Sequence, residues 1–239
     1  MQFTLFFSDL HLEDGAPRRT QWLLDLLAGP ARDAETVYIL GDLFEFWIGD
    51  DALSETARQV ATATVALRNH GVRCYFMHGN RDFLLGRQYA SEAGLEILPE
   101  SCVVDLYGTP TLLLHGDTLC TDDVEYQAFR QQSRNPAWQE AMLSLPVDER
   151  LQLARSARAA SEKHTSSTSM EIMDVNTGAV LDAFRENEVR RMIHGHTHRP
   201  ARHSVNLDGD QAERFVLADW YTSASYLKVS ARGIKSITL

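Results

Sequence analysis

A short apolar run that ends abruptly in Gly41-Asp42 constrains the fold of this chain more than any other feature. Residues 37–40 have the composition of a strand that is buried on both faces, which is typical of a parallel sheet in an α/β protein. Ligands bind at the carboxyl ends of such strands, because the strand fixes the side chain while the loop leaves it open. Asp42 alone could equally cap a helix or close a turn, so similar groups at other strand ends must decide.

Four further apolar runs also end in side chains that can bind a metal ion. They cover residues 3–7, 72–77, 111–114 and 192–193, and the side chains that follow them are Asp9, His11, Asn80, His115, His196 and His198. At two of these sites the metal-binding residues stand at positions i and i+2, which places both side chains on one side of an extended segment. Each residue alone could belong to a turn or to the core, but five such sites together are hard to explain by packing.

With Asp42 these side chains make seven candidate ligands, too many for one octahedral ion that also keeps water. They suit two ions if one carboxylate bridges, and Asp42 fits that role because it stands alone at its strand end. Oxygen and imidazole ligands without a thiolate favour Mn²⁺, leave Zn²⁺ or Fe²⁺ open, and argue against a structural zinc. Two metal ions roughly 3.5–4 Å apart are the usual machinery for hydrolysing phosphate esters.

Composition limits the partners and the compartment. The formal net charge of −10 over 239 residues argues against nucleic acid as the main partner, because binding phosphates needs a basic surface. Three widely spaced cysteines, Cys74, Cys102 and Cys120, fit reduced thiols in a cytosolic protein. The apolar residues 3–7 are too few for a signal peptide or a membrane span. We therefore expect one cytoplasmic domain of residues 1–239, with no obligate protein partner.

Helical periodicity predicts where the strands are connected by helices. Helices are expected over residues 20–27 and 54–69, between the first three strands, and over residues 124–132, 137–145, 148–163 and 180–187. About eighty residues separate His115 from His196, more than a strand and one helix require. We interpret residues 122–188 as a helical insertion that forms a lid over the active site. Its apolar side chains, such as Phe129 and Trp138, could seal the insertion or line a groove for acyl chains.

The chain from Gln211 onwards is expected to complete the fold. Residues 214–219, 226–230 and 234–239 are expected to form closing strands of a second sheet. No chemistry is assigned to them.

The order and spacing of the strand-end motifs resemble the signature of the calcineurin-like metallophosphoesterases. That signature stands here as Asp9-x-His11, Gly41-Asp42-x-x-Glu45, Gly79-Asn80, His115 and Gly195-His196-x-His198. The resemblance implies an α/β fold, a four-layer α/β/β/α sandwich of two mixed sheets, with the metals at the strand ends. It also implies two ligand sets, namely Asp9, His11, Asp42 and His198 for one ion and Asp42, Asn80, His115 and His196 for the other.

Arg81 departs from the pattern of this family. Many members have a histidine after the Asn80 position, where it assists the leaving group. Arginine cannot give up a proton at neutral pH, but its planar fork can clamp phosphate oxygens. Loss of an acid is tolerable when the leaving group is itself a phosphate and costly when it is an alkoxide. Asn80 and Arg81 are therefore expected at the reaction centre of an enzyme that cleaves a phosphoanhydride.

A longer match, over residues 8–12, 41–51, 77–83, 114–123 and 172–176, resembles those family members that cleave a lipid-linked nucleotide sugar in lipid A biosynthesis. It implies two Mn²⁺ per chain, attack of activated water on the phosphate nearer the nucleoside, and peripheral association with the cytoplasmic face of the inner membrane. The substrate contacts that it implies are Asn80, Arg81, Asp123, Ser161, Thr165, Thr168 and His196. A phosphoesterase of soluble nucleotides and a non-catalytic scaffold are the alternatives; the apolar insertion counts against the first and the complete ligand set against the second.

Overall fold

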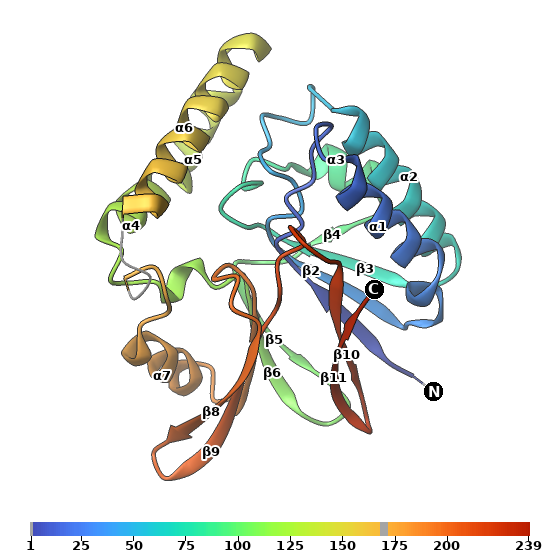
Figure 1. Ribbon diagram of the computed structural model, residues 1–239, viewed down its shortest axis with the longest axis vertical. Helices are drawn as coiled ribbons and strands as arrows, with labels where there is room; N and C mark the ends of the chain where they lie inside the picture. Colours follow the sequence, from blue (N-terminus) through green and yellow to red (C-terminus); the bar gives the residue numbers. More distant parts are fainter. Residues whose placement is uncertain (1, 168–171) are drawn as a thin grey trace.

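Two mixed β-sheets face each other and carry helices on their outer sides (Figure 1). The computed structural model describes residues 2–167 and 172–239, and of residue 162 and residues 164–167 it describes the backbone alone. The first sheet consists, in spatial order, of β11 (Gly233–Thr238), β10 (Ser225–Ser230), β1 (Thr4–Phe7), β2 (Thr36–Leu40), β3 (Arg73–Met77) and β4 (Glu96–Ile97). The second consists of β5 (Ser101–Asp105), β6 (Pro110–Leu114), β7 (Arg191–His194), β9 (Asp210–Val216) and β8 (Ala201–Leu207).

The central strands of the first sheet are buried on both faces, as their apolar composition predicts. Strands β1, β2 and β3 run parallel, and their side chains alternate between two different cores. Phe6 of β1 and Tyr38 of β2 face the second sheet, where their rings stack with centroids 5.0 Å apart. Leu5 and Val37 point the other way, toward the helices. A strand with this surrounding needs apolar residues at every position, because neither face meets water.

Helices cover the outer face of the first sheet. They are α1 (Pro17–Ala28), α2 (Glu55–Asn69) and the short α3 (Arg87–Glu92), with a 3₁₀ turn, η1 (Pro30–Asp33), after α1. Pro17 opens α1 at a position where a missing N–H costs nothing, and the Ser54 hydroxyl caps α2 by accepting from the Ala57 N–H. Helices α1 and α2 lie close to the segments that periodicity predicts, whereas α3 and η1 were not predicted.

The outer face of the second sheet is covered by α7 (Thr177–Glu186). Val180 and Phe184 of this helix are buried against Leu112, Leu114 and Met192 of the sheet. Helix, sheet, sheet and helix thus enclose three apolar cores, which confirms the predicted four-layer α/β/β/α sandwich.

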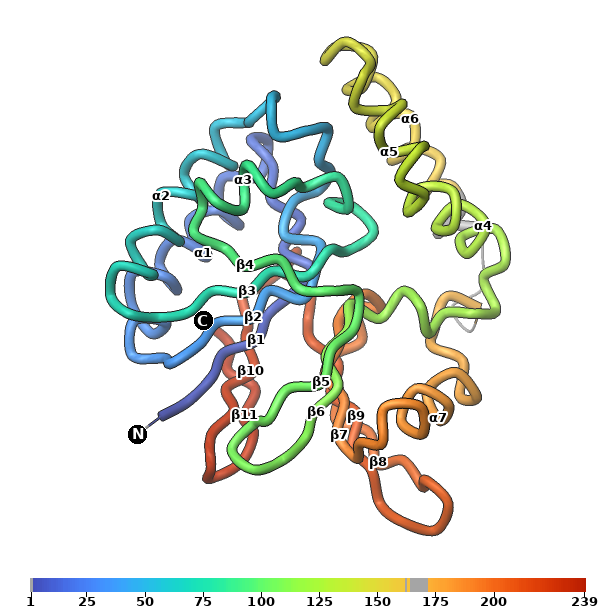
Figure 2. The backbone as a smooth tube through the Cα atoms, turned by 180° about the vertical axis from the view of Figure 1, so that it is seen from behind, coloured from blue at the N-terminus to red at the C-terminus, as the bar shows by residue number. Residues whose placement is uncertain are grey.

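The remaining helices form an arm between β6 and β7. After the 3₁₀ turn η2 (Asp117–Leu119) come α4 (Val124–Ser133), α5 (Pro136–Leu143) and α6 (Val147–Ser167). Figures 1 and 2 show α5 and α6 projecting beyond the sheets. The backbone of residues 164–167 is helical, so α6 extends beyond the predicted segment 148–163. Whether residues 122–188 act as a lid stays a prediction.

None of the helices within the described ranges is long and apolar enough to cross a bilayer.

The prediction that residues 226–230 and 234–239 join the second sheet is wrong. Strands β10 and β11 belong to the first sheet, where β10 pairs antiparallel with β1, and only β9 continues the second sheet. Their apolar pattern indicates strands but does not encode which sheet they join, because the pairing of β10 with β1 links residues more than 200 positions apart. Strands β4, β5 and β8 were not predicted; β4 has two residues and β8 is largely exposed.

Candidate metal centre

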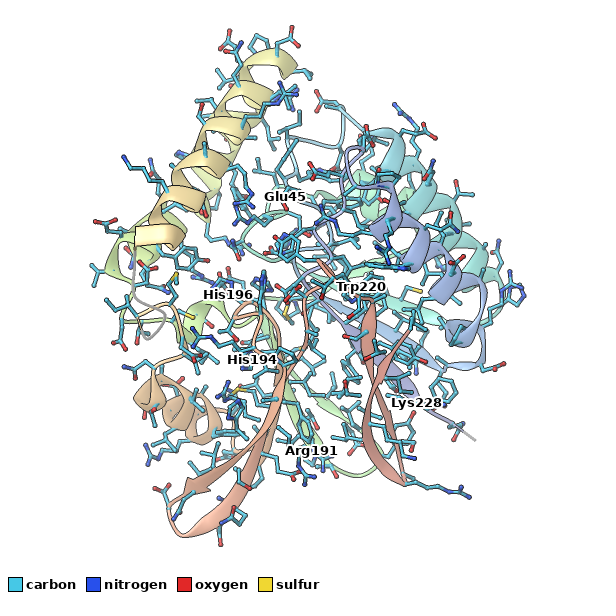
Figure 3. The ribbon with its side chains drawn as sticks, in the orientation of Figure 1. Glu45, Arg191, His194, His196, Trp220 and Lys228 are labelled. Carbon is cyan, nitrogen blue, oxygen red and sulfur yellow. The ribbon has the colours of Figure 1, made fainter. Side chains whose placement is uncertain are left out.

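The loops that follow five strands converge at one edge of the sandwich. They follow β1, β2, β3, β6 and β7, and they carry the seven predicted ligands Asp9, His11, Asp42, Asn80, His115, His196 and His198. In Figure 3, Glu45 and His196 lie near the centre of the molecule, between the α4–α6 arm and helices α1–α3. The structure therefore brings together groups that are up to 189 positions apart in the sequence, counting from residue 9 to residue 198.

One group of ligand atoms comes from Asp9, His11 and His198, which lie within 4.8 Å of one another. The Nε2 atoms of His11 and His198 are 3.3 Å apart, and Oδ1 of Asp9 lies 3.4 Å from Nε2 of His198. Oδ2 of Asp42 approaches Nε2 of His11 to 3.8 Å. Nitrogen and oxygen donors that face one point in this way suit a divalent transition-metal ion.

A second group surrounds Asn80. Oδ1 of Asn80 lies 3.0 Å from Nε2 of His115 and 2.9 Å from Nδ1 of His196. Oδ2 of Asp42 is 3.7 Å from Nε2 of His115. The same oxygen of Asp42 therefore faces both groups, which is where a bridging carboxylate would stand.

The backbone at these residues has an uncommon conformation. Five of the seven candidate ligands have a positive φ, namely Asp9 (57°), His11 (50°), Asp42 (52°), His196 (68°) and His198 (53°). Residues other than glycine adopt this left-handed region rarely, and they keep it where the surrounding structure enforces it, often at functional sites. The strained loops turn the side chains back over the strand ends, so that they meet.

Glycines beside the ligands give the room for this approach. A Cβ added at Gly79 would collide with the carboxylate of Asp42, and one at Gly195 would collide with that of Asp9. The Gly-Asn and Gly-His pairs of the sequence thus reflect close backbone approach and not only turn formation.

Groups behind the ligands orient them. Nδ1 of His115 donates to the carbonyl oxygen of Leu40 at 2.8 Å, which leaves its Nε2 facing the centre. Nδ1 of His11 lies 3.2 Å from the Glu45 carboxylate. Glu45 stands in the recognised motif, but its role as a partner of His11 was not predicted from the sequence.

Asp82 is a second orienting group that sequence reasoning missed. It is fully buried, and its carboxylate accepts from the N–H groups of Leu43 at 2.7 Å and Gly79 at 2.8 Å. It thereby joins the loop after β2 to the loop after β3. Burial, together with the nearby charge of Asp42, raises the pKa of Asp82 to about 6.

Electrostatics keeps two candidate ligands in the forms that bind metals. Burial and the neighbouring His115 lower the pKa of His196 to about 4, so its ring is neutral at pH 7. Burial alone would raise the pKa of Asp9, but the hydrogen bond and charge of His198 hold it below its usual value. A neutral imidazole and an ionised carboxylate are the ligating states.

Of the seven predicted substrate contacts, Asn80 and His196 are also candidate ligands and lie at the centre, as described above. Nη2 of Arg81 donates to the Ser161 hydroxyl at 3.2 Å, which joins the loop after β3 to α6. Asp123 is the N-cap of α4, where its carboxylate accepts from the Tyr126 N–H at 3.0 Å. The side chain of Thr165 and all of Thr168 lie outside the described residues.

A segment without predicted chemistry also reaches the centre. The Trp220 N–H donates to the carbonyl oxygen of Asp9 at 3.1 Å, and the ring of Tyr221 stacks on that of His11. This segment lies between β9 and β10; it contains Asp219, whose charge helps to raise the pKa of His198 against the effect of burial, but no candidate ligand was predicted in it.

Comparisons with known proteins agree with this geometry. A family model described as calcineurin-like phosphoesterase matches residues 4–200. A protein of Yersinia pseudotuberculosis serotype O:1b (strain IP 31758), named UDP-2,3-diacylglucosamine hydrolase, is 51% identical over 235 residues, which make up 98% of each chain. A protein of the same name from Yersinia pestis has the same identity and coverage.

A solved structure described as a novel archaeal phosphodiesterase covers 99% of both chains, with a TM-score of 0.50 and 12% sequence identity. At that identity it supports the fold alone. The stretch matched by the family model contains all seven candidate ligands, which the structure brings to one edge of a two-sheet sandwich. On these grounds the chain belongs to the calcineurin-like phosphoesterases.

Proposed function

We propose that this chain hydrolyses the diphosphate bond of UDP-2,3-diacylglucosamine. The products would be UMP and 2,3-diacylglucosamine 1-phosphate, in a step of lipid A biosynthesis. The observation that carries this proposal is the 51% identity, over 98% of both chains, to a protein named UDP-2,3-diacylglucosamine hydrolase. A match that extends through the helical arm supports a shared substrate as well as a shared fold.

The residues present fit two divalent ions. One would be held by Asp9, His11, Asp42 and His198, the other by Asp42, Asn80, His115 and His196, and Mn²⁺ suits this set of oxygen and imidazole donors. When bound, two such ions lower the pKa of a water molecule and neutralise charge that develops on phosphoryl oxygens.

Arg81 would hold the substrate phosphate at this centre. Its backbone N–H donates to Oδ1 of Asp42 at 2.8 Å, so its position is tied to the candidate bridging carboxylate. Its Nε is buried and has no hydrogen-bond partner among the described residues, which leaves a charged donor for phosphate oxygens. Since the guanidinium cannot protonate a leaving group, this arrangement favours a phosphate leaving group.

The arm supplies apolar surface for a lipid substrate. Part of this apolar surface packs the arm against the body. Met142 packs against the core between the first sheet and helices α1–α3, and the ring of Trp138 lies 6.1 Å from that of Phe83. Other apolar side chains stay exposed, among them Phe129 (39%), Leu143 (39%) and Leu153 (45%). We assign these to acyl chains and to peripheral association with the inner membrane.

Flotation with vesicles of phosphatidylethanolamine and phosphatidylglycerol tests the membrane assignment. Replacing Leu143 and Leu153 together by serine should weaken vesicle binding, because both add apolar contact to lipid. Val103→Ser is the control, since Val103 is also exposed, at 44%, but lies on β5 outside the arm. Equal loss in both variants, or none in either, would contradict the assignment.

Release of UMP in detergent tests the reaction. UDP-2,3-diacylglucosamine is compared with UDP-glucosamine that lacks acyl chains, after metal removal and Mn²⁺ restoration. Turnover of the acylated compound alone is expected. Equal turnover of both compounds would refute the lipid assignment, and turnover of neither would favour a non-catalytic scaffold.

A further inference from the structure

The ring of Tyr221 packs against His11 and His198, two candidate ligands of the same ion. Its ring lies nearly parallel to that of His11, with centroids 5.2 Å apart and an interplanar angle of 8°. The ring of His198 lies 5.7 Å from it at an angle of 57°. Tyr221 therefore touches both imidazoles whose Nε2 atoms face each other at 3.3 Å.

Arg19 also contacts the ring of Tyr221. The guanidinium carbon of Arg19 lies 5.2 Å from the centroid of the Tyr221 ring, within cation–π range. Nη2 of Arg19 lies 3.2 Å from a carboxylate oxygen of Glu13, and Nη1 reaches the carbonyl oxygen of Leu10 at 3.5 Å. The Tyr221 ring thus contacts both a cation that is held in place by other groups and the imidazole of His11.

The backbone before Tyr221 is also fixed. Trp220 is fully buried, its ring packs 5.7 Å from that of Phe7, and its Nε1–H donates to the carbonyl oxygen of Ser225 at 2.9 Å. Its backbone N–H donates to Asp9, the first candidate ligand of the same set. These contacts fix the backbone of Trp220, and they therefore limit the positions that the neighbouring Tyr221 ring can take.

Core packing does not account for Tyr221, because 46% of it is exposed. Among the candidate ligands of this ion, His198 is the one least enclosed by protein. Its side chain is 31% exposed, whereas Asp9, His11 and Asp42 are buried. The orientation of the His198 ring therefore depends most on a neighbouring side chain such as Tyr221.

We propose that Tyr221, backed by Arg19, is a positioning residue for His11 and His198 and sets the affinity of one of the two metal sites. It is not a ligand, and it acts through the orientation of two imidazole rings. The proposal rests on the two-ion assignment made under the proposed function.

Binding of Mn²⁺ to the metal-stripped chain, followed by calorimetry, tests it. Tyr221→Ala should weaken one ion by about 10- to 100-fold, the usual effect of removing a partner that orients a ligand, and leave the other unchanged. Electron paramagnetic resonance at Mn²⁺ concentrations between the two affinities should then show an isolated ion where the native chain shows a coupled pair. Tyr221→Phe should retain both affinities, because it keeps the ring.

Tyr75→Ala is the matched control. Tyr75 stacks on Tyr38 at 5.0 Å between the sheets, outside the candidate metal centre, so its loss should lower stability without changing either affinity. Equal weakening of both sites in Tyr221→Ala, no change in either, or a loss in Tyr221→Phe as large as in Tyr221→Ala would overturn the proposal. Calorimetry of the native chain comes first. If it binds fewer than two ions, both this proposal and the two-ion assignment are overturned before any variant is made.

Discussion

At the scale of single residues, Asp42 is the point where the two ligand sets meet. Its Oδ2 lies 3.8 Å from His11 and 3.7 Å from His115, while its Oδ1 accepts from the Arg81 N–H. Asp42→Asn keeps the shape and the bond from Arg81 but removes the charge. We expect both Mn²⁺ affinities to fall and kcat to drop by more than about 100-fold, beyond the usual effect of orienting groups. Calorimetry and UMP release measure the two effects.

Asp50→Asn is the matched control for this prediction. Asp50 accepts hydrogen bonds from Gly86, Tyr89 and Trp47 and belongs to neither ligand set. Native metal affinity in Asp42→Asn, or an equal loss in Asp50→Asn, would contradict the role given to Asp42.

The sequence predicts ligands better than it predicts the residues that orient them. Asp42 and His115 could be found because each follows an apolar strand and has a ligand-type side chain. Tyr221 carries no such mark, and its contact with His11 spans 210 positions, from residue 11 to residue 221. The left-handed backbone at Asp9 and His11 was equally hidden, because tertiary contacts impose it on residues that avoid it.

At the scale of elements, α6 is held to the body mainly by polar contacts. Arg150 is 3% exposed, and its Nη1 donates to the carbonyl oxygen of Ile48 at 2.6 Å and to Asp51 at 2.7 Å. Further along the helix, Arg158 contacts Glu45 and Ser161 contacts Arg81. Arg150 thus fixes the N-terminal part of α6. This holds the helix where Arg158 and Ser161 can contact residues of the candidate metal centre.

We predict that Arg150→Met loosens α6. Hydrogen bonds to charged groups each contribute about 1.5–3 kcal/mol, so α6 should exchange its amide hydrogens faster and KM for the acylated substrate should rise about tenfold. Hydrogen exchange over residues 147–161 and steady-state kinetics measure these changes. Arg185→Met, which removes an exposed ion pair between α7 and Asp208, should change neither. Unchanged exchange in Arg150→Met would contradict the prediction.

Elements are predictable from local pattern, but their partners are not. The central strands and α2 follow directly from apolar runs, periodicity and the Ser54 cap. The sheet to which β10 belongs depends on antiparallel pairing between Phe6 and Leu227, which no local pattern contains.

At the scale of the whole molecule, a thiol that is buried between the first sheet and its helices should make the protein less stable at alkaline pH. Burial raises the pKa of the Cys74 thiol to about 12, whereas an unfolded cysteine titrates near about 8.5. Above that pH only the unfolded chain loses the proton, so this contribution is complete below about pH 8.5 and is lost as pH rises toward 12.

We predict that Cys74→Ala reduces this alkaline sensitivity. Between pH 7.5 and 9.5 the free energy of unfolding should fall by about 1 kcal/mol less in Cys74→Ala than in the native chain. Chemical denaturation at both pH values measures the difference, and the common background from other groups cancels. Equal pH dependence in the two proteins would show that the thiol titrates alike in both states.

The four-layer architecture itself was within reach of the sequence, because the strand-end motifs and their order identify the family. The arm was predicted as helical from its length and periodicity. Its contacts with the body were not, since Arg150 and Arg158 read equally well as solvated charges on a helix surface.

The central claim is that seven side chains hold two divalent ions that enable the hydrolysis. It is tested most directly by titrating Mn²⁺ into the metal-stripped chain while bound Mn²⁺ and UMP release from UDP-2,3-diacylglucosamine are measured on the same samples. We predict negligible turnover without metal and a rise that reaches its plateau at two bound ions per chain. Full turnover without metal, or a plateau at one bound ion, would contradict the claim.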